Sequence, residues 1–340
     1  MDQSKYVTLL DLMVLAVCAF YIYLEELVTF LMPRPGKSLD GEIILITGTA
    51  NGLGKEICKQ LIKSKAKLVL WDISEDDNKR TAQDLRDSGA AFVYEDTVDV
   101  ADRNQVIVAA TKVRRHVGNV TILVNNAGIA VMQQFLELTT TSVDQTFRTN
   151  VLAHFWTLKE FLPYMLVRNA GHIVTICSTM GQMAMRGPTP YYSTKHAVHG
   201  MIECLKDELA HLEYKCEIKF TTVYPFPTIT PFLDPSYVAT RVIEGICGET
   251  EYLYIPETFR IYLAGKFFLP TKLHRLFVDF FVEHSHYSAT FRRPCIRNEQ
   301  PSDDLERTVD IQGKETKVDH VQNLFNSVTT EMIHTTPMER

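Results

Sequence analysis

Short apolar runs that alternate with helical stretches constrain the fold of this 340-residue chain more than any other feature. Strands are expected at residues 42–47, 67–72, 91–95, 121–126, 172–177 and 217–223. Helices are expected between them, at residues 52–64, 75–88, 102–116, 142–167 and 191–212. The strand segments are apolar throughout rather than alternating, so both faces of their sheet are covered. The pattern predicts a single doubly wound α/β domain with a parallel sheet.

An almost unbroken apolar segment, Tyr6–Leu24, precedes the first strand. Its length is just sufficient for a membrane-spanning helix, and Asp11 lies close enough to its start to reach the interface. Residues 1–37 are therefore predicted to hold a hydrophobic anchor that either spans the bilayer or lies in one leaflet. A helix packed on the domain is the alternative. Arg34 and Lys37 follow the segment, which favours a cytosolic domain.

The domain itself is expected to cover residues 38–290. It includes a late strand at 251–256 and an apolar stretch at 259–282, which suits core helices, a pocket lid or a second membrane-contacting surface. Residues 291–340 are polar without periodicity and are predicted to be a disordered tail. A net charge of −6 argues against a nucleic-acid partner. The seven cysteines are scattered and form no Cys/His cluster, so no metal site is predicted.

The first predicted strand leads into a glycine-rich turn, and a helical pattern follows at once. Glycines let the backbone turn tightly beside a pyrophosphate, and the first turn of the helix presents free N–H groups to it. The strand before the turn and the helix after it make this signal specific. The candidate phosphate-binding residues are Gly48, Asn51, Gly52, Leu53 and Gly54. The sequence therefore predicts a Rossmann-type dinucleotide site.

An acidic residue, Asp72, ends the second predicted strand, 18 residues after Gly54. A carboxylate in this register accepts hydrogen bonds from the ribose hydroxyls of the adenosine and repels a 2′-phosphate. Neither Asn51 nor Ile73 supplies the basic side chain that a 2′-phosphate would need. The predicted cofactor is NAD rather than NADP.

Four polar residues form a candidate catalytic group. Tyr191 and Lys195 are spaced i, i+4 on one helical face. A free phenol has a pKa of about 10, and a nearby ammonium together with a positively charged nicotinamide favours the phenolate. Ser178 follows the fifth strand, where its hydroxyl can stabilise a developing alkoxide. Asn150 lies inside a predicted helix, a poor position for asparagine on propensity alone.

These motifs, with Asp99-Val100 and the run Asn125-Asn126-Ala127-Gly128, occur in the order and spacing of the short-chain dehydrogenase/reductase family. The chain resembles this family from Glu42 to Pro231. The run from Asn150 to Pro163 and the apolar N-terminal segment are similar to one branch. That branch holds epidermal-type retinol dehydrogenases and type 11-like 17-beta-hydroxysteroid dehydrogenases.

The resemblance implies a role for each matching residue. Tyr191 is the general acid/base, Lys195 binds ribose and lowers the pKa of the phenol, and Ser178 orients the substrate oxygen. Asn150 holds a water in a proton relay behind Lys195. The remaining cofactor contacts are implied for Asp99, Val100, Asn126, Ala127, Gly128 and Thr230.

The branch also implies a setting for the enzyme. Its members are associated with the endoplasmic reticulum and lipid droplets, act on retinoids, steroids or other lipophilic alcohols, and often pair through their long helices. We therefore expect a membrane or lipid-droplet surface as partner, a lipophilic substrate and a homodimer. An NADPH-dependent carbonyl reductase and a catalytically silent scaffold are the alternatives. One departure is Phe226, which stands where the family usually has glycine.

Overall fold

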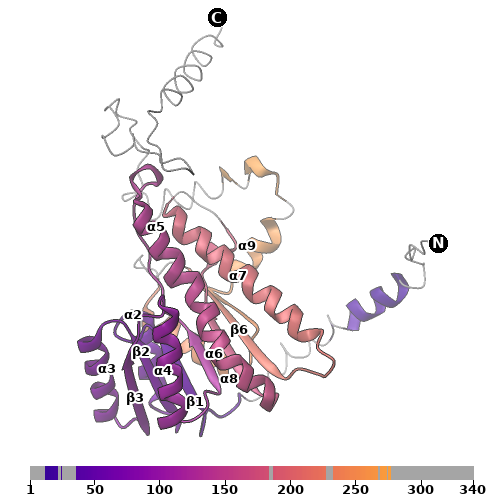
Figure 1. Cartoon of the computed structure of the whole chain (residues 1–340). Coiled ribbons are helices and arrows are strands. Elements are labelled where there is room, and N and C mark those ends of the chain that lie inside the picture. Colours follow the sequence, from indigo (N-terminus) through magenta and orange to yellow (C-terminus); the bar gives the residue numbers. More distant parts are fainter. Residues whose placement is uncertain are drawn as a thin grey trace, which may run out of the picture. The chain divides into compact units, whose positions relative to one another are not determined.

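A parallel sheet of seven strands forms the centre of the described chain (Figure 1). The structure is a computed structural model that describes residues 12–21, 24, 36–183, 187–226, 233–266, 269–273 and 275–276. The strand order is β3-β2-β1-β4-β5-β6-β7. The order reverses between β1 and β4, and doubly wound sheets bind their ligands at such a switch point. The predicted α/β fold class is confirmed.

The strand ends agree with the sequence prediction to within two residues. Their bounds are β1 Ile43–Thr47, β2 Lys67–Asp72, β3 Phe92–Thr97, β4 Ile122–Asn125, β5 Gly171–Ile176, β6 Ile218–Pro225 and β7 Tyr252–Ile255. All four residues of β4 are buried, as expected of a central parallel strand. Apolar strands between polar turns are a local signal, which explains the agreement.

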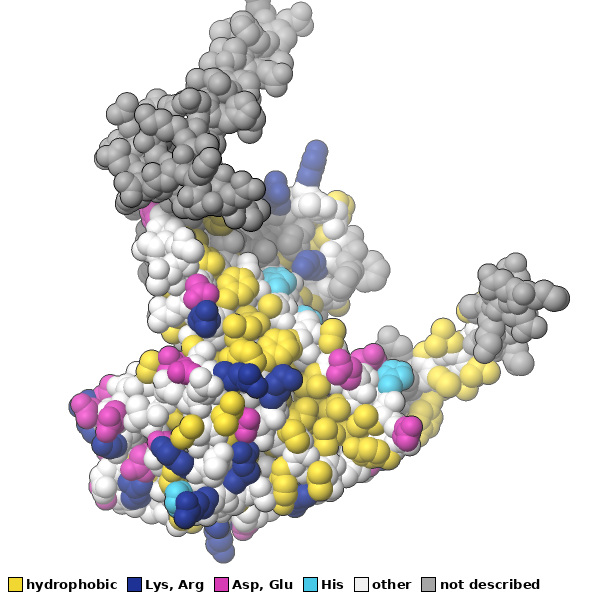
Figure 2. Space-filling view, in the orientation of Figure 1, with side chains coloured by type: hydrophobic (Ala, Val, Ile, Leu, Met, Phe, Trp, Pro, Cys, Tyr) yellow, Lys and Arg dark blue, Asp and Glu magenta, His cyan; other side chains and the backbone are white. Residues whose placement is uncertain are grey.

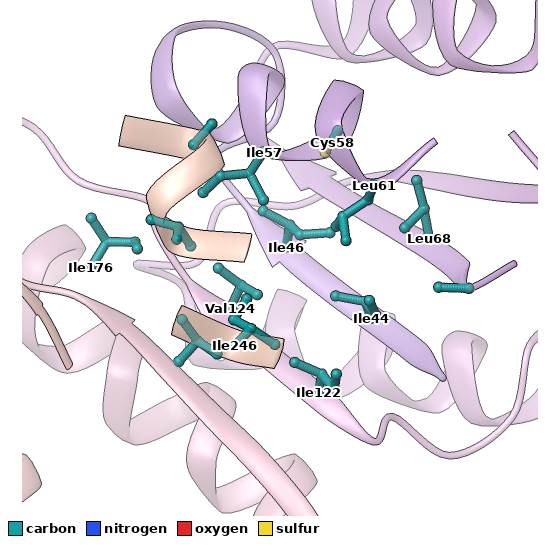
Figure 3. Close-up of a cluster of buried hydrophobic side chains, with 14 of the residues drawn as sticks. Ile44, Ile46, Ile57, Cys58, Leu61, Leu68, Ile122, Val124, Ile176 and Ile246 are labelled. Carbon is teal, nitrogen blue, oxygen red and sulfur yellow. The ribbon is translucent and has the colours of Figure 1, made fainter. Parts of the chain in front are cut away.

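Helices cover both faces of the sheet, and the sheet separates two hydrophobic cores. On one face α2 (Gly52–Leu61), α3 (Glu75–Asp87) and α8 (Pro235–Cys247) enclose a cluster that includes Ile46 and Val124 (Figure 3). On the other face α4 (Arg103–His116), α6 (Ala153–Arg168) and α7 (Thr189–Ala210) pack over Leu45 and Leu123. Neighbouring residues of a strand point to opposite faces, so each strand serves both cores.

Two helical features depart from the prediction. The single helix expected at 142–167 is divided into α5 (Thr140–Phe147) and α6 by a π-helical turn, Arg148–Leu152. Helix α8 was not predicted, although Asp234 caps its first turn by accepting a hydrogen bond from the Ser236 N–H at 3.0 Å. An acid at the N-cap followed by Pro235 is a recognised helix start, so the signal was present in the sequence.

The predicted anchor lies only partly within the described residues. Residues 12–21 and 24 are helical, and nearly all of their side chains are exposed. No helix in the described part of the chain has both the length and the apolar character needed to cross a membrane. Residues 1–11, 25–35 and the predicted tail at 291–340 lie outside the described residues, so the domain boundaries stay predictions.

The segment after the predicted anchor joins the sheet at the amino ends of its strands. The Lys37 N–H donates to the Cys247 carbonyl at 2.8 Å, and its Nζ lies 3.0 Å from Nδ1 of His172 on β5. Nε2 of His172 lies 2.8 Å from the Thr221 hydroxyl on β6. Burial lowers the pKa of His172 to about 3, so its ring is neutral and can accept from the ammonium.

Candidate active site

The glycine-rich turn after β1 forms a close backbone approach that only glycine permits. Gly48 adopts a φ of +73°, in the left-handed region. A Cβ on Gly54 would lie 1.9 Å from the Gly48 carbonyl oxygen, well inside van der Waals contact. Helix α2 begins within this turn at Gly52, and Asn51 precedes it without a side-chain cap. The first N–H groups of α2 therefore suit an anionic ligand.

Asn126 holds this turn in place from the end of β4. Its side-chain Nδ2 donates to the Thr47 carbonyl at 2.8 Å and to the Gly48 carbonyl at 3.1 Å. The backbone N–H groups of Asn126 and Ala127 both donate to the Thr47 hydroxyl at 3.0 Å. The predicted run at 125–128 thus braces the glycine turn as well as lining the cleft.

Asp72, at the end of β2, is fixed by two backbone donors. Its carboxylate accepts from the Ala50 N–H and from the Ser74 N–H, each at 2.9 Å. The first of these bonds ties the carboxylate to the glycine turn, so the register inferred from the sequence is present in space. The side chain of Ile73 beside it is 66% exposed, which leaves this end of the cleft open.

A cavity of about 480 Å³, called here the larger cavity, lies over the carboxyl ends of β1, β2 and β4. The glycine turn, Asp72 and the 126–128 segment line it. Asp99 and Val100 line it too, and the Asp99 carboxylate accepts from the Ala101 N–H at 2.9 Å; their contact with the cofactor stays a prediction. The uncapped helix end, the glycine cradle and the volume fit a dinucleotide.

A second cavity of about 190 Å³, called here the smaller cavity, adjoins the larger one. Both are lined by Leu53, Asn126, Gly128 and Ile129, so they lie side by side. Ser178, Tyr191 and Lys195 line only the smaller cavity. The end of β5 and helix α7 therefore bring three of the four predicted catalytic side chains to one cavity.

Backbone contacts fix the side chains in the smaller cavity. Nζ of Lys195 donates to the Ile176 carbonyl at 2.9 Å and lies 5.6 Å from the ring centre of Tyr191. The Ser178 hydroxyl donates to the Pro225 carbonyl at 3.3 Å and accepts from the Met180 N–H at 3.1 Å. Ser178 and Lys195 are almost completely buried. Both side chains are thus held by the ends of β5 and β6.

The pKa of Tyr191 shifts opposite to the expected direction. Burial raises it to about 12 and outweighs the hydrogen bond with Ser178, which lowers it. Burial also lowers the pKa of the Lys195 ammonium. The protein without cofactor therefore does not lower the pKa of the phenol toward neutral pH. The i, i+4 spacing predicted that Tyr191 and Lys195 lie close together, but it did not predict how deeply they are buried.

Asn150 lies in the π-helical turn and is completely buried. Its Oδ1 accepts from the Ile129 N–H at 2.8 Å, while its Nδ2 donates to the Ile129 carbonyl at 2.8 Å and to the Thr194 hydroxyl at 3.1 Å. Thr194 adjoins Lys195 in α7. The side chain thus joins the loop after β4 to the catalytic helix and does not line either cavity. π-Helical turns are frequent at functional sites.

The sequence analysis singled out two residues of the segment after β6, Phe226 and Thr230. Phe226 lines the smaller cavity, and its N–H donates to the Ile255 carbonyl at 2.8 Å. The side chain that replaces the family's glycine therefore forms part of the wall beside Tyr191. Thr230 lies outside the described residues, so its predicted cofactor contact stays a prediction.

Sequence reasoning missed several residues that line the two cavities. In the larger cavity these are Trp71, Ile73, Val98, Ala101, Ile129, Gln145 and Thr149. In the smaller cavity they include Ala130, Met132, Ile176, Cys177, Pro188 and Pro225. Most lie one or two residues from a predicted site residue. Their position next to the carboxyl end of a strand was therefore the sequence signal that could have identified them. Gln145 and Thr149 approach from α5 and the π turn, which no local pattern indicates.

Comparison with known proteins decides the family. The sequence model described as short chain dehydrogenase matches residues 42–238, more than half of the chain. The chain belongs to the short-chain dehydrogenase family. Its sheet order, glycine turn and grouping of Ser178, Tyr191 and Lys195 are the framework of this short-chain dehydrogenase.

Its curated relatives include retinol and steroid dehydrogenases. Epidermal retinol dehydrogenase 2 of Homo sapiens is 34% identical over 77% of this chain and 89% of that protein. Estradiol 17-beta-dehydrogenase 11 of Homo sapiens is 35% identical over 78% of this chain and 91% of that protein. The predicted branch of the short-chain dehydrogenases is confirmed, and the protein is an alcohol dehydrogenase of that branch.

Solved structures of short-chain dehydrogenases share the fold. One from Burkholderia phymatum, in complex with NAD, has a TM-score of 0.62 and 24% identity, and the match covers 67% of this chain and 93% of that one. An actinorhodin polyketide ketoreductase with NADPH has a TM-score of 0.58 and 26% identity, and the match covers 64% and 97%. Nicotinamide cofactors of both kinds thus occur among the neighbours.

Proposed function

We propose that this short-chain dehydrogenase oxidises a lipophilic alcohol with NAD, and that Tyr191 is the general base. The observation that carries the proposal is that the two cavities adjoin and share four lining residues. A dinucleotide in the larger cavity would extend its nicotinamide end into the smaller one, where Tyr191, Ser178 and Lys195 lie. The oxidised nicotinamide supplies the hydride acceptor and a positive charge.

The residues of the smaller cavity each have a role in this proposal. The Tyr191 phenolate takes the proton of the substrate alcohol and becomes the neutral phenol. The Ser178 hydroxyl turns from the Pro225 carbonyl to donate a hydrogen bond to the same substrate oxygen. Lys195, seated on the Ile176 carbonyl, provides a fixed positive charge beside the phenol and a donor for the ribose. Asn150 keeps the catalytic helix in register through Thr194. The implied water relay behind Lys195 would start here.

The lipophilic substrate follows from the surroundings of Tyr191. Its ring packs in a cluster with Met180, Met183, Phe226 and Phe259, which are apolar. Such a wall favours an alcohol whose bulk is hydrocarbon. The relatives named for retinol and estradiol support the same class. Oxidation of retinol, an estradiol-type steroid and a long-chain alcohol, assayed with NAD and with NADP on detergent-solubilised protein, tests the function.

The first prediction concerns Asp72 and the choice of cofactor. We expect the protein to favour NAD over NADP in kcat/KM by about 100-fold, because a fixed carboxylate repels a 2′-phosphate. The double variant Asp72→Asn with Ile73→Arg should lower this preference at least tenfold, since it removes the negative charge and adds a cation at the open end of the cleft. Steady-state kinetics with both cofactors measure the ratio.

Asp87→Asn is the matched control. Asp87 is an exposed acid at the last residue of α3, whereas Asp72 lies just before the first residue of that helix. It should leave the ratio unchanged. A native protein that prefers NADP would contradict the assignment of NAD and favour a carbonyl reductase. A protein that turns over neither cofactor with any of the alcohols would favour a scaffold.

Attachment to the endoplasmic reticulum membrane or to lipid droplets is part of the proposal. The helical residues at 12–21 carry exposed apolar side chains, including Leu15 and Phe20, which suit burial in lipid. We place the domain on the cytosolic side. Flotation with liposomes, compared between the full chain and a chain that begins at residue 36, checks the attachment. Equal flotation of both would contradict it.

Pairing of two copies through α6 and α7 is also proposed. Figure 2 shows hydrophobic side chains gathered over these helices. Phe155 is 40% exposed and Val167 is 85% exposed, while Met201 and Leu205 of α7 are only partly buried. An apolar face of this kind is typical of a subunit interface. Light scattering on the solubilised protein should give twice the mass of one chain, and a monomer would contradict the pairing.

A further inference from the structure

A cluster of apolar side chains, called here the apolar wall, borders the smaller cavity. Four of its members are buried: Met180, Met183, Tyr192 and Phe259. Tyr191 and Phe226, which line the cavity, pack against them together with Tyr254, Tyr262 and Leu263. Phe259, Tyr262 and Leu263 belong to α9 (Phe259–Lys266). A helix far from the catalytic residues in sequence thus packs behind Tyr191 and Phe226, the two members of the wall that line the cavity.

Hydrogen bonds fix α9 at both of its ends. Near its start, Arg260 donates to the Tyr252 carbonyl of β7 at 2.6 Å. At its last residue, Nζ of Lys266 donates to the Gln182 carbonyl at 2.9 Å. Gln182 stands only four residues after Ser178, at the end of the turn that the serine begins. The second bond therefore joins α9 to the segment that carries the catalytic serine.

Gln182 is also bound through its side chain. Its amide nitrogen lies 3.1 Å and its amide oxygen 3.2 Å from the Tyr254 hydroxyl on β7. The Tyr254 ring stacks on Tyr224 at a centroid distance of 4.9 Å and contacts Phe259 at 6.1 Å. One residue thus binds α9 through its backbone and β7 through its amide. We call Gln182, Tyr254 and Lys266 the latch.

We propose that the latch determines substrate specificity by holding the apolar wall beside the bound alcohol. The inference rests on the proposed function and adds residues that position the substrate rather than act on it. A hydrocarbon chain or ring system gains affinity in proportion to the apolar surface it buries. An alcohol too small to reach Phe226 contacts the wall only at Tyr191 and gains little from it. The latch therefore favours large apolar alcohols over small ones.

Two conservative variants release the latch without emptying the wall. Lys266→Met keeps the length of the side chain and removes the donor, and Tyr254→Phe keeps the stacked ring and removes the hydroxyl. In the double variant we expect KM for retinol to rise about tenfold with kcat nearly unchanged, as for a lost uniform-binding contact. The kcat/KM for isopropanol and the Kd of NAD should stay the same. Lys272→Met, at an exposed lysine beyond α9, is the control and should behave like the native protein.

Hydrogen–deuterium exchange gives a readout that does not depend on turnover. Amides of residues 259–266 should exchange faster in the double variant than in the native chain, while those of β5 should not change. The proposal is overturned if exchange in α9 is unaffected, or if retinol and isopropanol lose activity to the same extent. If the native protein oxidises neither alcohol, the proposed function fails and the specificity claim fails with it. Exchange would still report whether the latch holds α9.

Discussion

Tyr191→Phe should lower kcat for alcohol oxidation by at least about 1,000-fold, because no other group in the smaller cavity can take the proton of the alcohol as directly. The substitution removes only the hydroxyl, so the ring still packs against the apolar wall. Cofactor affinity, measured by titration of the protein fluorescence with NADH, should remain within about twofold of the native value. A variant that retains full kcat would show that Tyr191 is not the base.

The direction of the pKa shift fixes how the reaction depends on pH. Oxidation requires the phenolate, and burial holds the pKa of Tyr191 at about 12, so only a small fraction is ionised near neutral pH. In oxidation, kcat/KM should rise about tenfold per pH unit until the phenol titrates in the cofactor complex. Carbonyl reduction uses the neutral phenol and should be flat over the same range. The Tyr191→Phe variant should lose the rise.

Gly54→Ala should weaken cofactor binding by more than about 100-fold, the second large effect we expect. Its new Cβ would lie 1.9 Å from the Gly48 carbonyl oxygen and 2.6 Å from Nδ2 of Asn126, so the turn and its brace must both move. The same displacement should cost roughly 1–3 kcal/mol of stability. Calorimetric titration with NAD and thermal unfolding measure the two effects.

Gly200→Ala provides the matched control for this substitution. Gly200 lies on the exposed side of α7, and a Cβ there meets no atom within 4 Å. Alanine should therefore raise stability by roughly 0.5–1 kcal/mol, as expected inside a helix, and leave NAD affinity unchanged. If Gly54→Ala bound NAD as tightly as Gly200→Ala does, the glycine turn would not be the pyrophosphate site.

The fold could be predicted because its signals are local. Apolar strand runs and the glycine turn are read from adjacent residues, and parallel topology then forces Asn126, Ser178 and Phe226 to one edge of the sheet. The unpredicted helix α8 shows the limit of periodicity. Its start at Asp234-Pro235 was visible, but the segment before it gave no pattern that led to it.

Features set by contacts between distant residues could not be predicted. The low helix propensity of asparagine marked Asn150 as unusual in a helix. The π turn around it could not be predicted, because Asn150 bonds there to Ile129 and Thr194, which are distant in sequence. The pKa direction of Tyr191 depends on how deeply other elements bury it, which the spacing to Lys195 does not contain. The contact between Lys266 and Gln182 joins residues 84 apart in the sequence.

Strand β5 has a consequence for the proposed membrane attachment. Nζ of Lys37 contacts the strand at His172. The carbonyl that accepts from Nζ of Lys195 belongs to Ile176, four residues further along the strand and about 13 Å away. If the proposed anchor holds the chain at a membrane, residue 37 would connect it to a central strand through His172 and to the end of α8 through Cys247.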